Sequence, residues 1–193
     1  MKAVGIDLAG VETRPTGMCI MDGTMQARTC LLYTDAEILE KTLAIQPDVV
    51  AVDAPLALPR GRKSLEKRSS VHLRECDRDL LKMGIRFLPL TLGPMRQLTR
   101  RGMRLKTELE SCGLHVVETY PGAAQDILHI PRKGKGLEGL RKGLAQEGIS
   151  GLGKNSTADE LDAATCALAG ILYLKGEYRA LGNEAEMLMI LPL

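Results

Sequence analysis

Short apolar runs separated by turn residues open the chain, and this pattern is typical of β-strands. Lys2–Ala9 is almost wholly apolar, includes β-branched residues, and predicts a first strand. Gly17–Met21 predicts a second strand, Asp22-Gly23 a hairpin turn, and Gln26–Tyr33 the returning third strand. Three consecutive strands of this kind predict an antiparallel meander.

After these strands, the spacing of apolar residues along the chain becomes that of an α-helix. Asp35–Ile45 carries its apolar residues on one face and predicts a helix that is capped by Thr34 or Asp35. The next run, Val49–Ala54, is apolar at almost every position. Such a run indicates a central parallel strand that is covered on both faces.

A long polar and basic stretch separates this strand from the next apolar run. Arg60–Ser70 predicts a mobile loop, and Arg86–Gly93 a connection broken by prolines. Two stretches between these have helical periodicity, Val71–Gly84 and Pro94–Cys112. Gly102 is a candidate break in the second of them. The whole stretch is expected to form a helical insertion at about 56–112.

The last part of the chain returns to the α/β pattern. Leu114–Thr119 predicts another buried strand, and Ala158–Lys175 a long helix with a Ser156 or Thr157 cap and a Gly176 stop. Smaller elements are predicted too: helices at Ala123–His129 and Leu137–Glu147, and a tail at Met187–Leu191 that forms a short strand or an apolar arm.

This order of elements is that of the ribonuclease H-like fold. The prediction is an α/β protein with a mixed five-stranded sheet, helices on both faces and a helical, basic insertion. A chain of 193 residues with 45% hydrophobic residues suits one such domain over residues 1–193.

Composition excludes several classes of protein. No apolar run reaches about 18 residues, so neither a transmembrane helix nor a membrane partner is expected. Met1-Lys2 leads directly into a strand without a signal-like segment, so a cytoplasmic location is expected. The five cysteines are scattered and form no CxxC pair, which argues against a disulfide framework or a zinc ribbon.

Charge is unevenly distributed although the net charge is only +2. Residues 60–106 contain 14 basic and 4 acidic side chains, whereas residues 1–59 contain 4 basic and 8 acidic ones. A basic block of this kind can attract phosphates or nucleic acid, and a solvated helical face is the other interpretation. Aromatic residues make up only 3% of the chain, a smaller share than a surface that stacks bases requires.

Acidic residues lie where an apolar strand should contain none. Asp7, Asp53 and Glu118 each interrupt a predicted buried strand. A buried acid is costly unless it is paired, protonated or bound to a metal. Asp159 and Asp162 are spaced i,i+3 and share one face of the last helix. If these five acids meet at one end of the sheet, they predict a Mg²⁺ or Mn²⁺ site that could act on a phosphoryl group.

Each acid also has a structural interpretation. Asp7 could cap a turn, Asp53 could accept backbone hydrogen bonds at the end of its strand, and Asp159 could serve the helix N-terminus. Glu118 could pair with an arginine of the basic block. Asp162 lies further inside the helix and is harder to explain in this way.

Five segments in order resemble domain-of-unknown-function family 429. They are GIDLAG with Thr16-Gly17, AVDAPLALP, the Arg74–Ile85 segment RECDRDLLKMGI, VVETYP at Val116–Pro121, and DELDAATCALAG at Asp159–Gly170. That family is grouped with predicted nucleases of the ribonuclease H-like fold, so the resemblance implies this fold and a nuclease activity.

Holliday-junction resolvases of the same superfamily provide a partial template for the site. They hold metal with an acid on the first strand, an acid on the fourth strand and two acids on the last helix. Asp7, Asp53, Asp159 and Asp162 fall on the corresponding predicted elements. Glu118 has no counterpart in that set and resembles more closely the fifth-strand acid of a related bacterial family of small resolvase-like proteins. The resemblance therefore implies a metal set of Asp7, Asp53, Asp159 and Asp162, and catalytic roles for Asp7, Asp53, Glu118 and Asp162.

Basic side chains supply candidate contacts to a nucleic-acid backbone. An arginine can hold a phosphate with two hydrogen bonds, and lysines in glycine-rich stretches can follow a backbone. Ion pairing within the protein and simple solvation are the alternatives. The candidates are Arg74, Arg78, Arg100, Arg101, Lys133 and Lys154.

Three functions stay open on this basis. The first is a metal-dependent nuclease that acts on nucleic acid. The second is a nucleotide- or phosphate-binding, phosphotransferase-like module of the actin-like branch, which would need two such domains, so a homodimer stays open. The third is a nucleic-acid-binding protein without catalysis.

Overall fold

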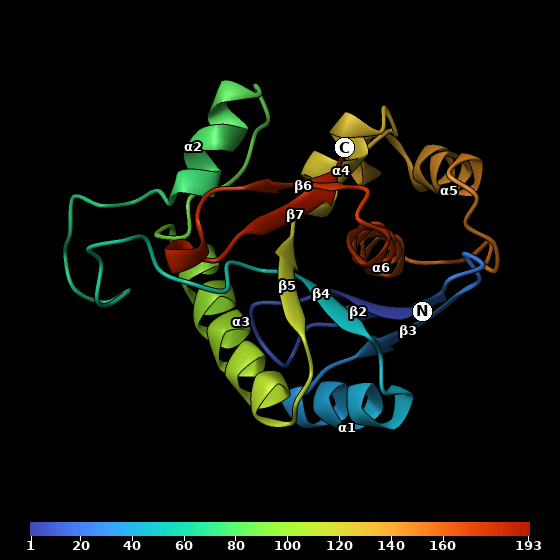
Figure 1. The fold of residues 1–193 in the computed structure, drawn as a ribbon, viewed down its shortest axis with the longest axis horizontal. Coiled ribbons are helices and arrows are strands. Elements are labelled where there is room, and N and C mark those ends of the chain that lie inside the picture. Colours follow the sequence, from blue (N-terminus) through green and yellow to red (C-terminus); the bar gives the residue numbers. More distant parts are fainter.

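The computed structural model describes all residues, 1–193, and its centre is a seven-stranded sheet (Figure 1). The strand order is β3-β2-β1-β4-β5-β7-β6. The strands are β1 (Lys2–Asp7), β2 (Thr16–Asp22), β3 (Ala27–Leu32), β4 (Val49–Asp53), β5 (Val116–Thr119), β6 (Tyr178–Leu181) and β7 (Met189–Pro192).

The predicted meander is confirmed. β2 pairs antiparallel with both β1 and β3. Asp22 shapes the turn, because its Oδ1 accepts hydrogen bonds from the backbone N–H groups of Thr24 and Gln26 at 2.9 and 3.2 Å. Met25 takes the positive φ of 64° that the tight connection requires. The parallel strands β4 and β5 then follow β1 in the sheet, also as predicted.

The prediction of five strands is wrong, because the C-terminus adds a hairpin to the sheet. The tail predicted at Met187–Leu191 forms β7, which runs parallel to β5 with Glu118 opposite Met189. β6 pairs antiparallel with β7 at the edge. Its four residues, YRAL, are too short and too mixed to show a period. Their place in the sheet depends on pairing with β7, which is a tertiary contact.

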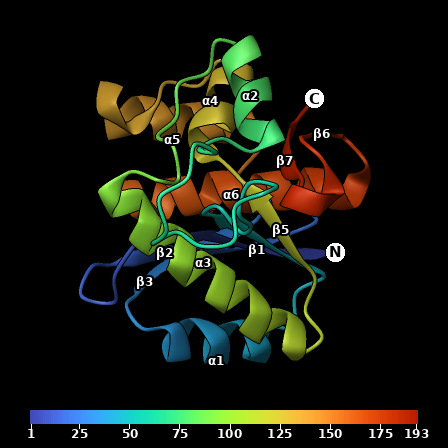
Figure 2. The same cartoon turned by 90° about the vertical axis from the view of Figure 1, so that its left-hand side faces the viewer.

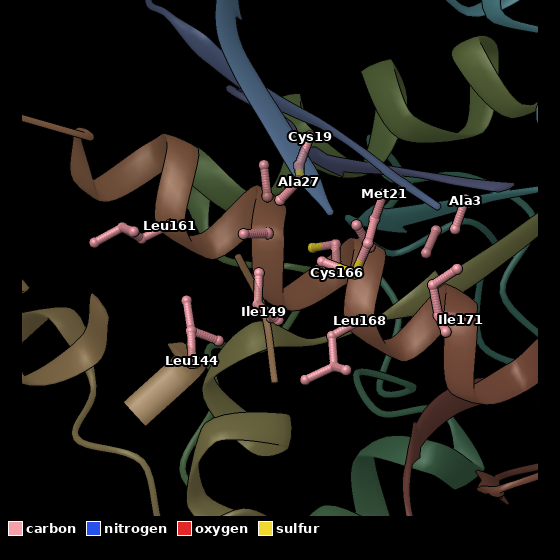
Figure 3. Close-up of a cluster of buried hydrophobic side chains, with 14 of the residues drawn as sticks. Ala3, Cys19, Met21, Ala27, Leu144, Ile149, Leu161, Cys166, Leu168 and Ile171 are labelled. Atoms are coloured by element: carbon pink, nitrogen blue, oxygen red, sulfur yellow. The ribbon is translucent and has the colours of Figure 1, made fainter. Parts of the chain in front are cut away.

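Helices cover both faces of the sheet (Figures 1 and 2). α1 (Asp35–Ile45) and α3 (Gly93–Ser111) lie on one face, where Ile38 and Leu105 pack against strand residues such as Ile6. α6 (Ala158–Lys175) crosses the other face and buries an apolar cluster that includes Cys166 and Ile171 (Figure 3). α4 (Pro121–Ile127) and α5 (Leu137–Gln146) pack outside α6.

Both predicted capping sites form. Thr34, rather than Asp35, caps α1 in a capping box with Glu37. Thr157 caps α6 in a capping box with Glu160, and Gly176 ends the helix with φ 77°. Since Glu160 completes the second box, Asp159 is not needed for it.

The helices between β4 and β5 differ in detail from the prediction. α2 spans Glu75–Lys82 and is shorter than predicted, because Arg74 is its extended N-cap. α3 runs unbroken through Gly102. A Cβ at Gly102 would overlap that of Ala54, so the glycine allows the helix to approach the end of β4 closely.

Two glycines, one in β1 and one in β2, allow α6 to pack closely on these strands. A Cβ at Gly5 of β1 would overlap the backbone of Ala163 and Ala167, and a Cβ at Gly17 of β2 would overlap the backbone of Asp159. The helix therefore lies directly on the strands, and its N-terminal turn lies over the end of β1.

Substituting Gly5 by alanine is expected to lower the free energy of unfolding by about 2–3 kcal/mol, because the added methyl group forces two backbones apart. Urea denaturation of Gly5→Ala measures the loss. The matched control is Gly93→Ala, whose Cβ would meet no atom within 4 Å. Equal stabilities of the two variants would contradict this account of helix packing.

Candidate functional site

Asp7 and Asp53 are direct neighbours on adjacent parallel strands. They are the last residues of β1 and β4 and lie opposite each other in register. Adjacent strands are about 4.8 Å apart, so the two side chains leave the sheet side by side. Alternation along the strands places both on the α6 face, because Gly5 and Ala51, two residues earlier, contact or pack under α6.

The first turns of α6 bring two further acids to the same end of the sheet. Asp159 lines a cleft together with Asp7, and Asp162 is 5% exposed. Gln125 of α4 donates a 2.8 Å hydrogen bond to Oδ1 of Asp162. Lys133 Nζ lies 2.7 Å from Oδ2 of the same carboxylate. Asp162 is thus held from both sides.

The acids strongly affect one another's protonation. Burial, followed by the charge of Asp162, raises the pKa of Asp7 to about 7, although Lys133 acts to lower it. Burial and the charge of Asp7 raise the pKa of Asp53 well above its usual range. Burial acts to lower the pKa of Lys133, but its contact with Asp162 and the charges of Asp7 and Asp159 raise that pKa overall. The cluster favours bound protons or bound cations.

Asp7→Asn is expected to stabilise the metal-free protein at pH 8 and to stabilise it by less than half as much at pH 5. A carboxyl whose pKa rises on folding loses stability as pH increases from about 4 to about 7. Asparagine removes that penalty. The free energy of unfolding at pH 8 should rise by about 1–2 kcal/mol, a value reduced to allow for screening by solvent and by Lys133. Urea denaturation in chelator at both pH values measures it.

A gain of the same size at both pH values would contradict the burial of an ionisable Asp7. Asp48→Asn is the control. Asp48 precedes β4 at the opposite end of that strand and is exposed to solvent.

The residues present suit a hard divalent cation in their chemistry. Carboxylate oxygens are the preferred ligands of Mg²⁺ and Mn²⁺. The side chains are not yet arranged as ligands, because no group of three or more His, Cys, Asp or Glu side chains surrounds a common point. The ammonium of Lys133 lies among these acids instead. A metal would require Lys133 to withdraw and the carboxylates to turn.

Glu118 lies outside this group, contrary to its predicted catalytic role. Thr119, and not Glu118, is opposite Asp53 in register, so Glu118 points to the other face of the sheet. There it is 1% exposed, and its two oxygens accept 2.6 Å hydrogen bonds from the guanidinium of Arg74. Oε2 also accepts a 2.8 Å hydrogen bond from Leu56 N–H. Its role is to join β5, the end of β4 and the start of α2.

Two of the predicted phosphate-binding arginines are buried and engaged, so their assignment as phosphate ligands is wrong. Arg74 pairs with Glu118 and Asp77. Arg101 donates to Asp35 Oδ1 at 2.6 Å and to the carbonyl oxygens of Ala9 and Tyr33 at 2.7 and 2.6 Å. Both guanidinium groups are buried and hydrogen-bonded within the protein, which a charge count along the sequence does not show.

The other basic candidates lie on the surface. Arg78, Arg100 and Lys154 are exposed, and Arg100 pairs with Glu66. Lys133 alone reaches the acids, from the 3-10 turn Lys133–Lys135. With Arg14 it provides the positive charge around a cleft of about 200 Å³ above Asp7 and Asp159.

Sequence reasoning missed Gln125. It is 1% exposed and hydrogen-bonds both Asp162 and Thr165, so it fixes the orientation of the helix carboxylate. A polar residue inside the predicted short helix at Ala123–His129 was a weak signal, because its partners are about 40 residues away along the chain. The role of Lys133 as partner of Asp162 depends on a similar long-range contact.

Comparison with known proteins identifies the fold. No family model and no curated protein matches the chain. The solved structure of RuvC from Thermus thermophilus superposes with a TM-score of 0.50 and 16% sequence identity, over 91% of this chain and 97% of that chain. The same protein in complex with a Holliday junction substrate gives a TM-score of 0.49 with the same coverage.

This likeness, at 16% identity, shows the fold alone. The predicted ribonuclease H-like fold is confirmed. No helix is long and apolar enough to span a membrane. Membership of family 429 stays a prediction from the ordered motifs.

Proposed function

We propose that the protein is a metal-dependent nuclease that hydrolyses phosphodiester bonds of nucleic acid, and that it belongs to family 429. The observation that carries this proposal is the set of four acids on the α6 face, with Asp7 and Asp53 in register and Asp159 and Asp162 above them. The raised pKa values of Asp7 and Asp53 show that a bound cation would stabilise their charged forms. The fold supports the proposal, because it is the one shared with RuvC.

In this proposal each side chain has a defined task. Asp7, Asp53 and Asp162 hold Mg²⁺ or Mn²⁺, and Asp159 supports them from the rim. When bound, the ion activates water and stabilises charge on the phosphate oxygens. Gln125 keeps the Asp162 carboxylate turned toward the site. Lys133 leaves Asp162 and contacts a phosphate of the substrate.

Basic residues near the site can contact the nucleic-acid backbone. Arg14 and Lys133 border the cleft above Asp7, and Gly10 lines both this cleft and a neighbouring groove. Arg100 and Arg104 line that groove, with 59% of each side chain exposed. A phosphate backbone that follows the two depressions would pass over the acids. Such contacts predict binding that weakens with salt.

The test is a cleavage assay on branched, duplex and single-stranded DNA and RNA with Mn²⁺, Mg²⁺ or a chelator. We expect cleavage of at least one substrate by the wild type with either metal, and its loss in the chelator and in Asp7→Asn. Asp48→Asn, at the other end of β4, should retain the wild-type rate.

Equal activity of wild type and Asp7→Asn would reject the site. Salt-dependent binding that survives loss of the acids, without any cleavage, would favour the non-catalytic binder. Stabilisation by Mg-nucleotide without cleavage would favour the phosphotransferase-like module.

Lys133→Met is expected to tighten Mn²⁺ binding about tenfold, because the variant loses the cation that competes for Asp162. Mn²⁺ titration followed by electron paramagnetic resonance measures the dissociation constant. Lys135→Met, at the end of the same 3-10 turn, is the control and should bind Mn²⁺ like the wild type. Unchanged affinity in Lys133→Met would show that the lysine does not compete with the ion.

A further inference from the structure

A second depression lies beside the acids, and the nuclease proposal leaves it without a role. It has a volume of about 180 Å³ and lies between the ends of β4 and β5 and the helices α2 and α3. Asp53 forms part of its wall. A group in this cavity could therefore be joined by a few bonds to a phosphate held at the acids.

The walls suit a flat, apolar group. Eight of the fourteen lining residues are hydrophobic, and two of them, Phe87 and Tyr120, supply aromatic rings. Ligand pockets for drug-sized molecules have volumes of about 300–1,000 Å³. The smaller volume here suits one ring system and is too small for a whole nucleotide cofactor.

The cavity also has a polar side with an unsatisfied donor. Arg74 lines it and is 1% exposed, and both terminal nitrogens of its guanidinium are engaged by Glu118 and Asp77. Its Nε–H has no hydrogen-bond partner. A buried donor without a partner is costly, so an acceptor on a bound ligand would stabilise this wall.

Large apolar side chains are exposed around the connection from α2 to α3. Leu88 is 63% exposed and lines the cavity, and Leu92 is 46% exposed without lining it. Leu81 and Met83 of the α2 end are exposed as well. Of these, Leu88 alone lines the cavity, and an apolar side chain at such a place can enter between bases and unstack them.

We propose that this cavity binds one nucleobase of the substrate, unstacked from its neighbours, while the adjoining phosphate lies at Asp7 and Asp53. The identity of the ligand rests on the proposed nuclease function. Phe87 and Tyr120 provide the surfaces for the ring, the aliphatic side chains surround it, and the polar wall at Arg74 meets its edge. Base stacking on aromatic side chains tolerates every base, since each has a π-face.

The first test is direct binding of the fluorescent nucleotide 2-aminopurine deoxyribose 5′-monophosphate. We expect quenching on binding to the wild type, and affinity at least about fivefold weaker in Phe87→Leu, which keeps an apolar side chain but removes the ring. Leu88→Ser should weaken binding as well. Leu92→Ser is the matched control, an exposed leucine of the same connection that does not line the cavity, and should bind like the wild type.

The second readout is the Michaelis constant for cleavage of an oligonucleotide, which should rise in Phe87→Leu and Leu88→Ser but not in Leu92→Ser. Selective loss of nucleotide binding without any cleavage would support the base site and reject the nuclease. Mn²⁺-dependent cleavage with a Michaelis constant unchanged in all three variants, together with no selective loss of nucleotide binding, would overturn the base site and leave the nuclease intact.

Discussion

Replacing Glu118 by alanine is expected to lower the free energy of unfolding by about 3–5 kcal/mol, because the variant leaves the buried guanidinium of Arg74 without its main partner. Arg74 would keep only Asp77, at 3.3 Å, as a charged partner. Leu56 N–H would lose its acceptor too. Urea denaturation measures the loss. The slope of the unfolding free energy against urea concentration should be the same as in the wild type.

The double variant Arg74→Met/Glu118→Leu distinguishes this structural role from a catalytic one. Replacing a buried ion pair by apolar side chains of similar size is often neutral or stabilising. The double variant should therefore be more stable than Glu118→Ala. At saturating substrate it should also retain the rate of metal-dependent cleavage, because Glu118 lies on the face of the sheet away from the acids, whereas loss of the Arg74 wall of the cavity described above should raise the Michaelis constant. Normal stability of Glu118→Ala combined with loss of cleavage would instead place Glu118 in the active site.

Asp53→Asn is expected to lower the rate of metal-dependent cleavage by about 10³-fold or more, which corresponds to several kcal/mol of lost charge stabilisation at the transition state. The reason is its position in register with Asp7, where the two carboxylates would share one ion. Single-turnover cleavage with saturating Mn²⁺ measures the rate of the chemical step.

The double variant Asp7→Asn/Asp53→Asn tests whether the pair acts as a unit. When two residues act as a unit, removing both lowers the reaction rate little more than removing one. The double variant should thus be about as slow as either single variant. If the loss of rate in the double variant equals the product of the two single losses, the two acids act independently. A normal rate in Asp53→Asn would show that Asp53 is not part of the site. Asp48→Asn again serves as control.

Much of the fold followed from local patterns. The strands near the N-terminus are apolar runs with clear turn signals, and the two best-defined helices carry complete capping boxes at Thr34 and Thr157. These signals lie within a few residues of each other, so sequence alone contains them. β6 was missed because its four residues take their conformation from pairing with β7.

The site was predictable in part for a similar reason. An acid that ends an apolar strand is visible in the sequence, and Asp7 and Asp53 occupy equivalent ends of neighbouring strands. Glu118 has the same local signature, but its strand is shifted by one residue, so it points to the opposite face. A one-residue difference in register cannot be read from either strand alone.

The structural roles of the buried arginines could not be predicted, because their partners are far away along the chain. Arg74 and Arg101 look like exposed basic residues in the sequence, yet their partners Glu118 and Asp35 lie 44 and 66 residues away. The charge block of residues 60–106 therefore overstates the positive charge available for ligands. Lys133, outside this block, is the basic residue that reaches the acids.

The central claim is that the acids at the ends of β1 and β4 and at the start of α6 bind a divalent cation. The most direct measurement is the anomalous difference density of crystals soaked in Mn²⁺. We predict a peak with Asp7 and Asp53 among its ligands, and Lys133 withdrawn from Asp162. Saturating Mn²⁺ with no peak among these carboxylates, and with the contact between Lys133 and Asp162 intact, would contradict the claim.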